Sequence, residues 1–344
     1  MPRSSRWSLP SQVVAFALIT VLAAGCNRPA ATGSVELLNV SNDPTRELWR
    51  DMNEHFAAKT AKESGIEVTV RQSHGGSGSQ ARAIVDGLEA DLATLGLWSD
   101  TKALEKAGLV EADWETRLPN GAKPYSSTIV FVVRKGNPKG IKDWADLAKP
   151  DVQIITPNPK TSGNGKLSFL GAWGSVLQSG GTEAQAEELV RTIYKHVPVL
   201  DTAARAATVT FAQKKIGDVH LTWESEAHLE VAESKGELEI IYPKTSIEAE
   251  VPVAVVDAVA KKKGTWGTAT AYAKYLYTDE AQEVFAKHYY RPQSAEVLAK
   301  HSDRFPPIEM FSVTRIAPGG WEEANKRFFA DGALFDTIYT TSVE

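Results

Sequence analysis

The sequence predicts an α/β protein built from two lobes. Strand-like and helix-like segments alternate over most of the chain, and two valine-rich extended runs, near 128–133 and 251–255, separate the alternating series into parts of similar size. In each part, a turn rich in glycine and small polar residues precedes a helix. Such turns expose backbone N–H groups at the positive end of a helix, which suits the binding of an anion.

The composition is that of a soluble globular protein. The chain has 344 residues, of which 42% are hydrophobic and 24% charged, so it can bury a substantial core. Its formal net charge of -5 gives no basic footprint, and no nucleic-acid partner is expected. An anion-binding protein with this charge must rely on local dipoles and hydrogen bonds.

Residues 1–25 have the pattern of a signal peptide. A positively charged start is followed by a short apolar run at 13–22, and small residues then precede Cys26. This end resembles a bacterial lipobox, in which the cysteine carries the lipid; a plain signal peptide with an incidental cysteine is the alternative. Residues 26–33 are then a lipidated tether to a membrane. Cys26 is the only cysteine, which excludes an intramolecular disulfide.

The first part of the mature chain follows the order β-α-β-α-β. We expect strands at 35–40, 66–70 and 90–95, with helices at 44–60 and 80–87. Asp43 is the expected N-cap of the first helix, because Pro44 follows it in the first turn. This alternation favours a largely parallel sheet.

The second part repeats the alternation. After a β-branched strand at 127–134 and a Gly-Asn-Pro turn, we expect strands at 152–156, 197–200 and 219–222, and helices at 166–178 and 183–196. An extended segment at 250–256 leads to helices at 268–277 and 279–289. The two extended runs are the expected crossings. Lobe 1 is therefore discontinuous, with residues 34–129 and 252–344, and lobe 2 comprises residues 130–251.

Two turns are the expected anion cradles. The first, RQSHGGSGS at 71–79, follows a strand and precedes a helix-like run from Gln80. The second, PKTSGNG at 159–165, also precedes a helix. Glycine lets bare backbone approach a ligand, and the helix adds its dipole. Two cradles on opposite lobes predict a cleft that closes around a small oxyanion.

Short segments spread over nearly the whole mature chain match one family. They are DPTREL at 43–48, RQSHGGSG at 71–78, LP at 118–119 with PY at 124–125, VVRKGNPK at 132–139, ITPNPK at 155–160, AWG at 172–174, GDV at 217–219 with WE at 223–224, YRP at 290–292 and GGW at 319–321. By these segments the chain resembles the periplasmic sulfate/thiosulfate-binding proteins, the solute receptors of ABC-type sulfate importers.

The resemblance implies a two-lobed periplasmic-binding-protein (type II) fold with two hinge crossings and an interlobe ligand cleft. It implies that the anion is held, without its water, by uncharged donors. The implied donors are the backbone around Asp43 and Ser77, the hydroxyl of Ser162, the backbone N–H groups of Gly163, Asn164 and Ala204, and the indole N–H of Trp223.

The resemblance also implies partners and a location. The partners are sulfate or thiosulfate and the permease subunits of an ABC importer energised by its ATPase. The protein would act as a monomer in the periplasm, without a cofactor, a metal or a catalytic residue. Three positions depart from the family pattern: Asn42 replaces a frequent aromatic residue, and Asn164 and Ala203 replace frequent glycines. The preference between sulfate and thiosulfate stays open.

Asp43 decides between oxyanions. Sulfate is a dianion that offers only acceptors, whereas phosphate usually keeps a proton and needs an acceptor in its site. We expect the Asp43 carboxylate to cap the helix that begins at Pro44, while its backbone N–H serves the anion. A receptor of the same fold for molybdate or phosphate is the alternative.

Motifs that would indicate an enzyme are weaker than those that indicate an anion receptor. Residues 76–81 fit the G-x-G-x-x-A form of a dinucleotide fingerprint, but a single match of this kind is weak. The stretch before Lys166 lacks the first glycine of a Walker A loop, and Leu167 stands at its Ser/Thr position. Glu224 and His228 have i, i+4 spacing but no third metal ligand, and we expect them on a solvated helix face.

Several candidate residues also have ordinary structural readings. A tryptophan at the position of Trp223 is more often part of a core, and only the resemblance makes it a ligand donor. Ser77 and Ser162 suit turns and N-caps, a role compatible with anion binding at a helix start. We expect Arg46, Lys160 and Arg205 at the surface or behind the direct contacts.

Overall fold

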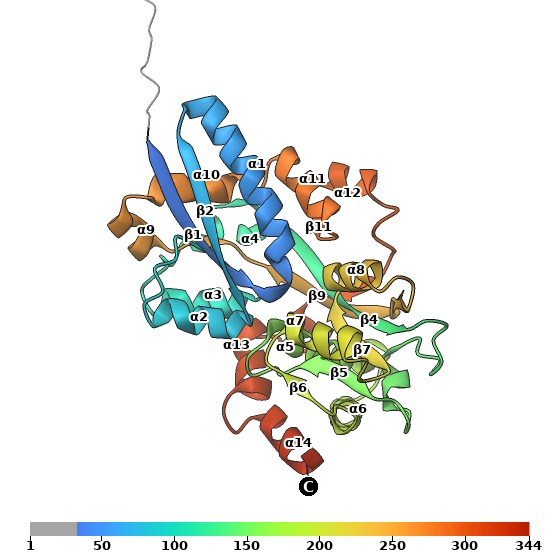
Figure 1. Ribbon diagram of the computed structural model, residues 1–344. Helices are drawn as coiled ribbons and strands as arrows, with labels where there is room; N and C mark the ends of the chain where they lie inside the picture. The colour runs from blue at the N-terminus through green and yellow to red at the C-terminus, as the bar shows by residue number, and fades with distance from the viewer. Residues whose placement is uncertain (1–32, 344) are drawn as a thin grey trace, which may run out of the picture.

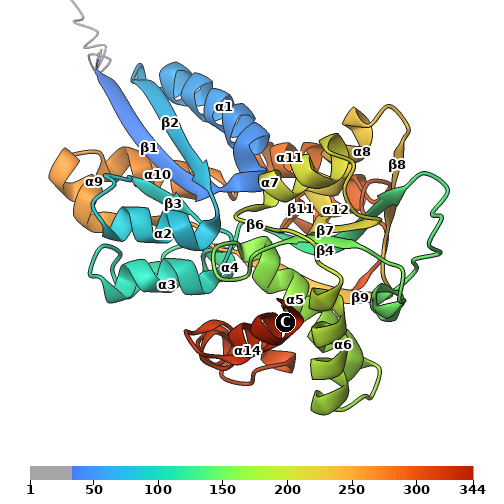
Figure 2. The same ribbon diagram turned by 60° about the horizontal axis from the view of Figure 1, so that its bottom comes forward.

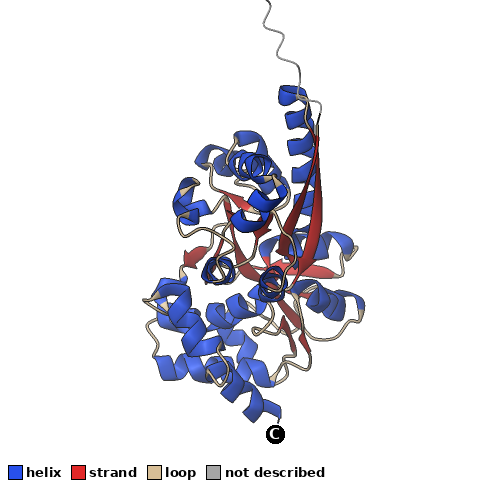
Figure 3. Cartoon of the chain, turned by 90° about the vertical axis from the view of Figure 1, so that its left-hand side faces the viewer, coloured by secondary structure: helices blue, strands red, loops and turns tan. Residues whose placement is uncertain are grey.

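The computed structural model describes residues 33–343, and it contains two sheets surrounded by helices. We call the part built on the sheet of order β10-β3-β1-β2 lobe 1, and the part built on the sheet of order β12-β9-β4-β7-β5-β6 lobe 2. Figure 1 shows lobe 1 above lobe 2, and Figure 3 shows helices flanking the strands on both sides. The α/β class and the two-lobed arrangement are confirmed.

Lobe 1 is a largely parallel sheet. Its central strand pairs in parallel with two others, and a short fourth strand joins antiparallel at the edge. The strands are β1 (Ser34–Asn42), β2 (Glu67–Gly75), β3 (Leu92–Thr94) and β10 (Ala254–Val255). The helices are α1 (Arg46–Ser64), α2 (Ser77–Val85), α3 (Trp98–Lys106), α4 (Pro119–Ala122), α9 (Asp257–Lys263), α10 (Trp266–Tyr275), α11 (Asp279–Lys287) and α12 (Ala295–Lys300), with short helices η1 (Asp43–Thr45) and η2 (Trp114–Thr116).

Helix α1 illustrates how the sequence shapes lobe 1. Leu48, Met52 and Phe56 recur every four residues, and all three are buried. The helix ends at Gly65, whose φ of 71° is the left-handed conformation that glycine adopts without a side-chain penalty. The chain then turns directly into β2.

Lobe 2 has a mixed sheet. Its strands are β4 (Tyr125–Arg134), β5 (Ile154–Pro157), β6 (Leu200–Asp201), β7 (Val219–Trp223), β8 (Leu238–Ile241), β9 (Thr245–Val251) and β12 (Glu309–Phe311); β11 (Arg291–Pro292) also pairs with β4. Its helices are α5 (Gly163–Gln178), α6 (Glu183–Lys195), α7 (Ala204–Thr208), α8 (Glu224–Glu233), and the short segments η3 (Trp144–Ala148) and η4 (Val209–Gln213). β5 pairs in parallel with both β6 and β7.

Strands β4 and β9 connect the lobes. The first residues of β4, 125–128, pair with β9, and residues 129–133 pair with β7 of lobe 2. Shortly after β9 the chain enters β10, which pairs with β3 in lobe 1. Nearly all of β4 is buried, as expected for a strand covered on both faces.

The C-terminal segment packs mainly on lobe 2 and also contacts α3 of lobe 1. It contains η5 (Val313–Arg315), α13 (Gly320–Ala324), η6 (Asn325–Phe329) and α14 (Leu334–Val343), and α14 lies beside α6 (Figure 2). The ring of Phe169 in α5 lies 5.4 Å from that of Phe328. The placement of residues 252–344 in lobe 1 stays a prediction, although β12 and α14 lie against elements of lobe 2.

The expected elements occur, but several boundaries differ. β2 continues through Gly75, so the first five residues of the predicted 71–79 turn are strand, and α2 begins at Ser77 rather than Gln80. Helices α3, α7, α9, α12 and α14 are among the elements that were not predicted; α7 has only five residues and is too short to show a periodic pattern. Within residues 33–343, no helix combines the length and apolar composition needed to cross a bilayer.

Candidate anion-binding site

The site residues of lobe 1 follow the carboxyl ends of parallel strands. β1 ends at Asn42, opposite Gly75 at the end of β2, so the two ends lie side by side. η1 starts directly after β1 at Asp43, and α2 starts after β2 at Ser77. In open α/β sheets, ligands bind at this edge.

Lobe 2 presents the same arrangement. β7, β5 and β6 are parallel neighbours, and each leads at its carboxyl end into a helix. The loop after β5 reaches Ser162, the N-cap of α5; α7 starts at Ala204 after β6; Trp223 ends β7 and precedes α8. The hydrogen bond from Ser162 N to Asn158 O (2.9 Å) shapes the β5–α5 loop.

The two sets of helix starts meet between the lobes. A Cβ on Gly76 would collide with the carbonyl oxygen of Thr161, and one on Gly163 would lie 3.6 Å from the Cβ of Ser77. Only glycine permits the close approach at position 76. The structure therefore brings both predicted cradles together. The predicted site residues Asp43, Ser77, Ser162, Gly163, Asn164, Ala204 and Trp223 are all buried.

The helix starts at this junction leave their first N–H groups without protein acceptors. None of η1, α2, α5 and α7 has an N-cap side chain that accepts a hydrogen bond. Within residues 33–343, no acceptor is found for the backbone N–H of Ser77, Gly163, Asn164 or Ala204. Buried N–H groups in proteins are nearly always paired. These groups, at the positive ends of helices, are therefore suited to an anion.

The hydroxyl and indole donors differ in their partners. The Ser77 hydroxyl donates to the Asp100 carboxylate and accepts from Gly96 N (2.9 Å), so Ser77 can offer only its backbone N–H to a ligand. For the Ser162 hydroxyl and the Trp223 indole N–H, no hydrogen-bond partner is found in the described part of the chain. Asp100 was missed by the sequence analysis because it belongs to α3, distant in sequence and without a motif.

The expected role of the Asp43 carboxylate is wrong. Asp43 is the first residue of η1 and not its N-cap, so its side chain does not cap the helix. One carboxylate oxygen binds the Arg46 guanidinium, and the other accepts from the backbone N–H of Arg205 at 3.3 Å. The carboxylate thus joins lobe 1 to the first turn of α7 and is already occupied by two donors.

Asn164 and Ala203, which replace frequent glycines of the family, are accommodated without strain in the backbone or loss of the backbone N–H of Asn164. The Asn164 side chain turns to β7, where its Nδ2 donates to Leu221 O at 2.9 Å, and it approaches Ser168 Oγ at 3.4 Å. It therefore ties α5 to β7 while its backbone N–H stays available. Ala203 has φ -154° and ψ 166°, an extended conformation that does not require glycine. Asn42 is buried beside Gly96.

The cations near the site already have partners. Arg205 Nη2 lies 3.0 Å from Glu47 in lobe 1 and 2.9 Å from Glu226 in lobe 2. Burial raises the pKa of Glu226 to about 7, although Arg205 opposes the rise. Lys160 pairs with Asp336 at 2.9 Å. These groups lie in ion pairs, so the geometry favours uncharged donors as the direct contacts.

The described residues offer no metal site, and Glu224 and His228 do not lie where the sequence predicted. The expectation that Glu224 and His228 lie on a solvated face is wrong: Glu224 is fully buried against Arg291, and His228 stacks on Tyr289 with 3.8 Å between ring centroids. In residues 33–343, no group of three or more His, Cys, Asp or Glu side chains could hold a metal. Cys26 lies outside the described residues.

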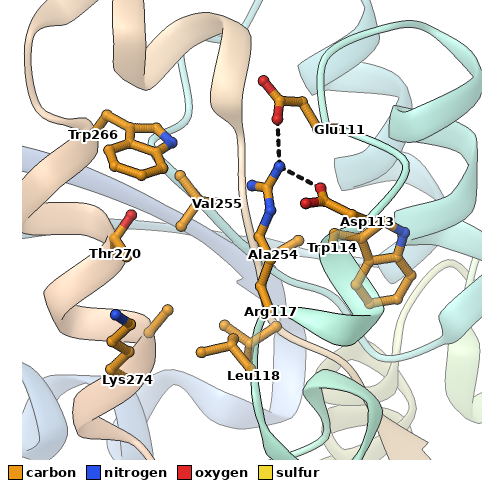
Figure 4. Close-up of a pocket in the computed structure, with 12 residues that line it drawn as sticks. Glu111, Asp113, Trp114, Arg117, Leu118, Ala254, Val255, Trp266, Thr270 and Lys274 are labelled. Atoms are coloured by element: carbon orange, nitrogen blue, oxygen red, sulfur yellow. Dashed lines mark hydrogen bonds and ion pairs between the residues drawn. The ribbon is translucent and has the colours of Figure 1, made fainter.

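A pocket of about 400 Å³ on lobe 1 is separate from the site (Figure 4). Arg117 faces it between Glu111 and Asp113, and Trp266 forms the opposite wall. The guanidinium is bound by both of these carboxylates and by Asp257 at 2.7 Å. None of the predicted site residues lines this pocket.

The chain is similar to known solute-binding proteins over most of its length. Residues 37–291 match the model of the family described as bacterial extracellular solute-binding protein. A thiosulfate-binding protein of Pseudomonas aeruginosa is 49% identical over 324 residues, covering 93% of this chain and 97% of the relative. A sulfate-binding protein of Escherichia coli is 49% identical over 306 residues, covering 88% of this chain and 93% of the relative.

A solved structure extends the likeness to three dimensions. The sulfate-binding protein SubI from Mycobacterium tuberculosis superposes with a TM-score of 0.78 at 31% identity. The superposition covers 86% of this chain and 99% of that structure. The likeness therefore includes both lobes.

Proposed function

The chain belongs to the bacterial extracellular solute-binding proteins, and from this premise we propose that it captures sulfate, and also thiosulfate, and delivers it to an ABC importer. It has the two-lobed type II fold of such receptors. Its relatives named for sulfate and thiosulfate binding support the ligand class. The observation that carries the proposal is the convergence of four uncapped helix starts between the lobes.

The donors match the chemistry of sulfate. Sulfate is fully ionised and offers only lone pairs, so a site made of donors can satisfy it. In the proposed site, Asp43, Ser77, Gly163, Asn164 and Ala204 donate backbone N–H groups, Ser162 its hydroxyl and Trp223 its indole N–H. Burying a dianion without such partners costs many kcal/mol. Each hydrogen bond to a charged group contributes roughly 1.5–3 kcal/mol, enough in sum for a dissociation constant near micromolar, about -8 kcal/mol.

Asp43 bears on the choice of anion. Its carboxylate is held by Arg46 and by Arg205 N, so it is not a free acceptor for a protonated oxyanion. A site of this kind favours sulfate over hydrogen phosphate. Titration calorimetry of residues 34–344 with sulfate, thiosulfate, molybdate and phosphate tests this choice. Tighter binding of phosphate or molybdate than of sulfate would contradict it.

The lobes close on the ligand because donors come from both. Binding that contacts both lobes favours the closed state over the open one. In this proposal, lobe 1 comprises residues 34–129 and 252–308, and lobe 2 comprises 130–251 together with the C-terminal segment that packs on α5 and α6. The exposed rims of both lobes would dock on the permease, and the protein would act as a monomer without catalysing a reaction.

Trp223→Phe tests the indole donor. Phenylalanine retains an aromatic ring but removes the N–H, so we expect sulfate binding to weaken about 10-fold with the fold intact. Calorimetry and thermal melts measure the two effects separately. Unchanged affinity would show that the indole only packs.

The location rests on the N-terminus. A receptor of this family works outside the cytoplasm, and we propose that a lipid on Cys26 anchors it to a bacterial membrane after residues 1–25 are removed. Expression of the full chain and of Cys26→Ala, followed by labelling with an alkyne fatty acid, tests the anchor. Label on both proteins, or on neither, would contradict it.

A further inference from the structure

A buried ion pair lies directly behind Trp223. Glu224 is the first residue of α8, and its side chain is fully buried. Its carboxylate oxygens accept from Arg291 Nε at 2.7 Å and Nη2 at 2.8 Å. This two-point contact fixes the relative orientation of the two groups, because the planar guanidinium matches the carboxylate.

Arg291 is itself held in place. Nη2 also donates to Pro306 O at 3.1 Å, and the guanidinium lies 5.3 Å from the centre of the Phe305 ring. Arg291 belongs to β11, where it pairs with Ser126 of β4. The guanidinium therefore offers Glu224 a rigid anchor.

The ion pair lies beside the crossing between the lobes. Trp223 pairs with Ile129 of β4, three residues beyond the Ser126 partner of Arg291. Both members of the pair thus lie along the same edge of β4, the strand on which the chain passes from one lobe to the other. Points near a crossing strand move least when two lobes rotate, so the pair can persist in the open and closed states.

The stability of the fold does not by itself account for this pair. Burial raises the pKa of Glu224, with Arg291 and the Tyr242 hydroxyl opposing the rise. A buried ion pair is often no more stabilising than apolar side chains of the same volume, but it is more specific in direction. Trp223, the N-cap of α8, makes no side-chain capping bond, so the first turn of α8 is held by the contacts of its two buried carboxylates, Glu224 with Arg291 and Glu226 with Arg205.

We propose that Glu224 and Arg291 are positioning residues that aim the Trp223 indole N–H at the bound anion. The inference rests on the proposed function, in which that indole is a ligand donor. The indole N–H lies far from the backbone, so a small shift in the first turn of α8 moves it out of hydrogen-bonding geometry. Since the pair is neutral overall, it fixes this geometry without adding net charge beside the anion.

A double-mutant cycle tests the proposal. Sulfate affinity is measured by calorimetry for the wild type, Glu224→Gln, Trp223→Phe and the double variant. If Glu224 acts through the indole, Glu224→Gln weakens binding about 5- to 10-fold in the wild type and less than about 2-fold in the Trp223→Phe background, because coupled neighbours are not additive. Arg291→Lys, which retains the charge but loses the two-point contact, weakens binding in the same way.

Glu230→Gln is the matched control. Glu230 is a second buried carboxylate of α8, paired with His220 at 2.9 Å, but it lies nearly two turns from Trp223. We expect its loss to leave sulfate affinity unchanged even where it lowers the melting temperature. A loss of affinity in Glu230→Gln equal to that in Glu224→Gln would assign both effects to a loosened helix and overturn the proposal.

An NMR readout reports the indole directly. In a ¹H–¹⁵N spectrum, the indole signal absent from Trp223→Phe is expected to move on addition of sulfate, and to move less in Glu224→Gln and Arg291→Lys. Equal movement in all three proteins, or an additive cycle, would overturn the positioning role while leaving the anion site standing. No effect of Trp223→Phe on affinity would instead remove the indole from the proposed site.

Discussion

The helix starts between the lobes differ from those of three helices on the outer surface. α6, α11 and α12 begin after Thr182, Thr278 and Ser294, whose hydroxyls each accept from a backbone N–H of the first turn. η1, α2, α5 and α7 meet at the buried junction, and none has such a cap. Ser162 has the right residue type to cap α5, yet its hydroxyl makes no capping bond.

The difference separates stability from binding. A side-chain cap typically stabilises a helix by about 1 kcal/mol. Helices α6, α11 and α12 gain this contribution, whereas the junction helices leave their first N–H groups without a protein acceptor within residues 33–343. Substitutions at the two kinds of helix start should therefore affect different properties.

The largest effect is expected from removing a backbone donor of α5. Gly163→Pro deletes the N–H at the first helical position, where proline is well tolerated, and the extended Ser162 (φ -121°, ψ 130°) suits a residue before proline. We expect sulfate binding to weaken about 100-fold, because a hydrogen bond to a buried dianion is lost. Calorimetry measures the change.

Two variants control for the added atoms. Gly163→Ala adds a Cβ near Leu97 (3.3 Å) but keeps the N–H, so it separates crowding from donor loss. Glu183→Pro places proline at the same position of the capped helix α6 and should not alter affinity. If Gly163→Pro binds sulfate as tightly as Gly163→Ala, the contrast between the helix starts has no functional meaning.

Removing the hydroxyl of the N-cap residue should have opposite consequences at a junction helix and at a surface helix, with effects of intermediate size. Ser162→Ala is expected to weaken sulfate binding about 10-fold with an unchanged melting temperature, because in the proposed site its hydroxyl donates to the ligand, and it makes no capping bond to α5. Thr182→Ala is expected to lower stability by about 1 kcal/mol with unchanged affinity. Calorimetry and thermal melts on both proteins are needed. Loss of stability in Ser162→Ala alone would reverse the interpretation.

Asn164→Ala should change stability more than affinity. The Asn164 side chain donates to Leu221 O, so its removal leaves a buried carbonyl unpaired and lowers the free energy of unfolding by about 1–2 kcal/mol. The backbone N–H remains, and we expect sulfate affinity to stay within about 3-fold of the wild type. Tighter binding by the variant would indicate that the side chain crowds the anion.

The smallest effect concerns pH and Glu226. Its pKa is about 7 in the folded protein, raised by burial from 4.5, so the folded state holds this proton more tightly than the unfolded chain. The stability it contributes is complete below about pH 4.5 and is lost as the pH rises through about 7. The melting temperature of the wild type should therefore fall relative to Glu226→Gln between about pH 5 and 8. A constant difference would contradict the raised pKa.

The alternation of elements and the two cradles could be predicted from the sequence. Residues 76–78 and 162–164 carry a local glycine-rich signal, and both lie at the junction. The proposed role of Trp223 as a donor rests only on the resemblance, because the residue pattern itself favours a core position. Its place at the junction is set by β7, which the sequence did predict.

Contacts between distant residues could not be predicted. The Asp43 carboxylate was expected to cap its own helix, but it binds the first turn of α7 across the lobes. Arg291 and Glu224 are 67 positions apart, and no local pattern indicates their pairing. Such contacts depend on how the lobes are docked, which the sequence pattern does not encode locally.

A crystal structure of the protein grown with selenate, a sulfate analogue with an anomalous signal, tests the central claim most directly. The account predicts one tetrahedral anion between η1, α2, α5 and α7, with its oxygens about 2.7–3.1 Å from the N atoms of Gly163, Asn164 and Ala204. No lysine or arginine nitrogen would be in direct contact with it. An anion bound elsewhere, or one gripped mainly by Arg205 or Lys166, would contradict the account.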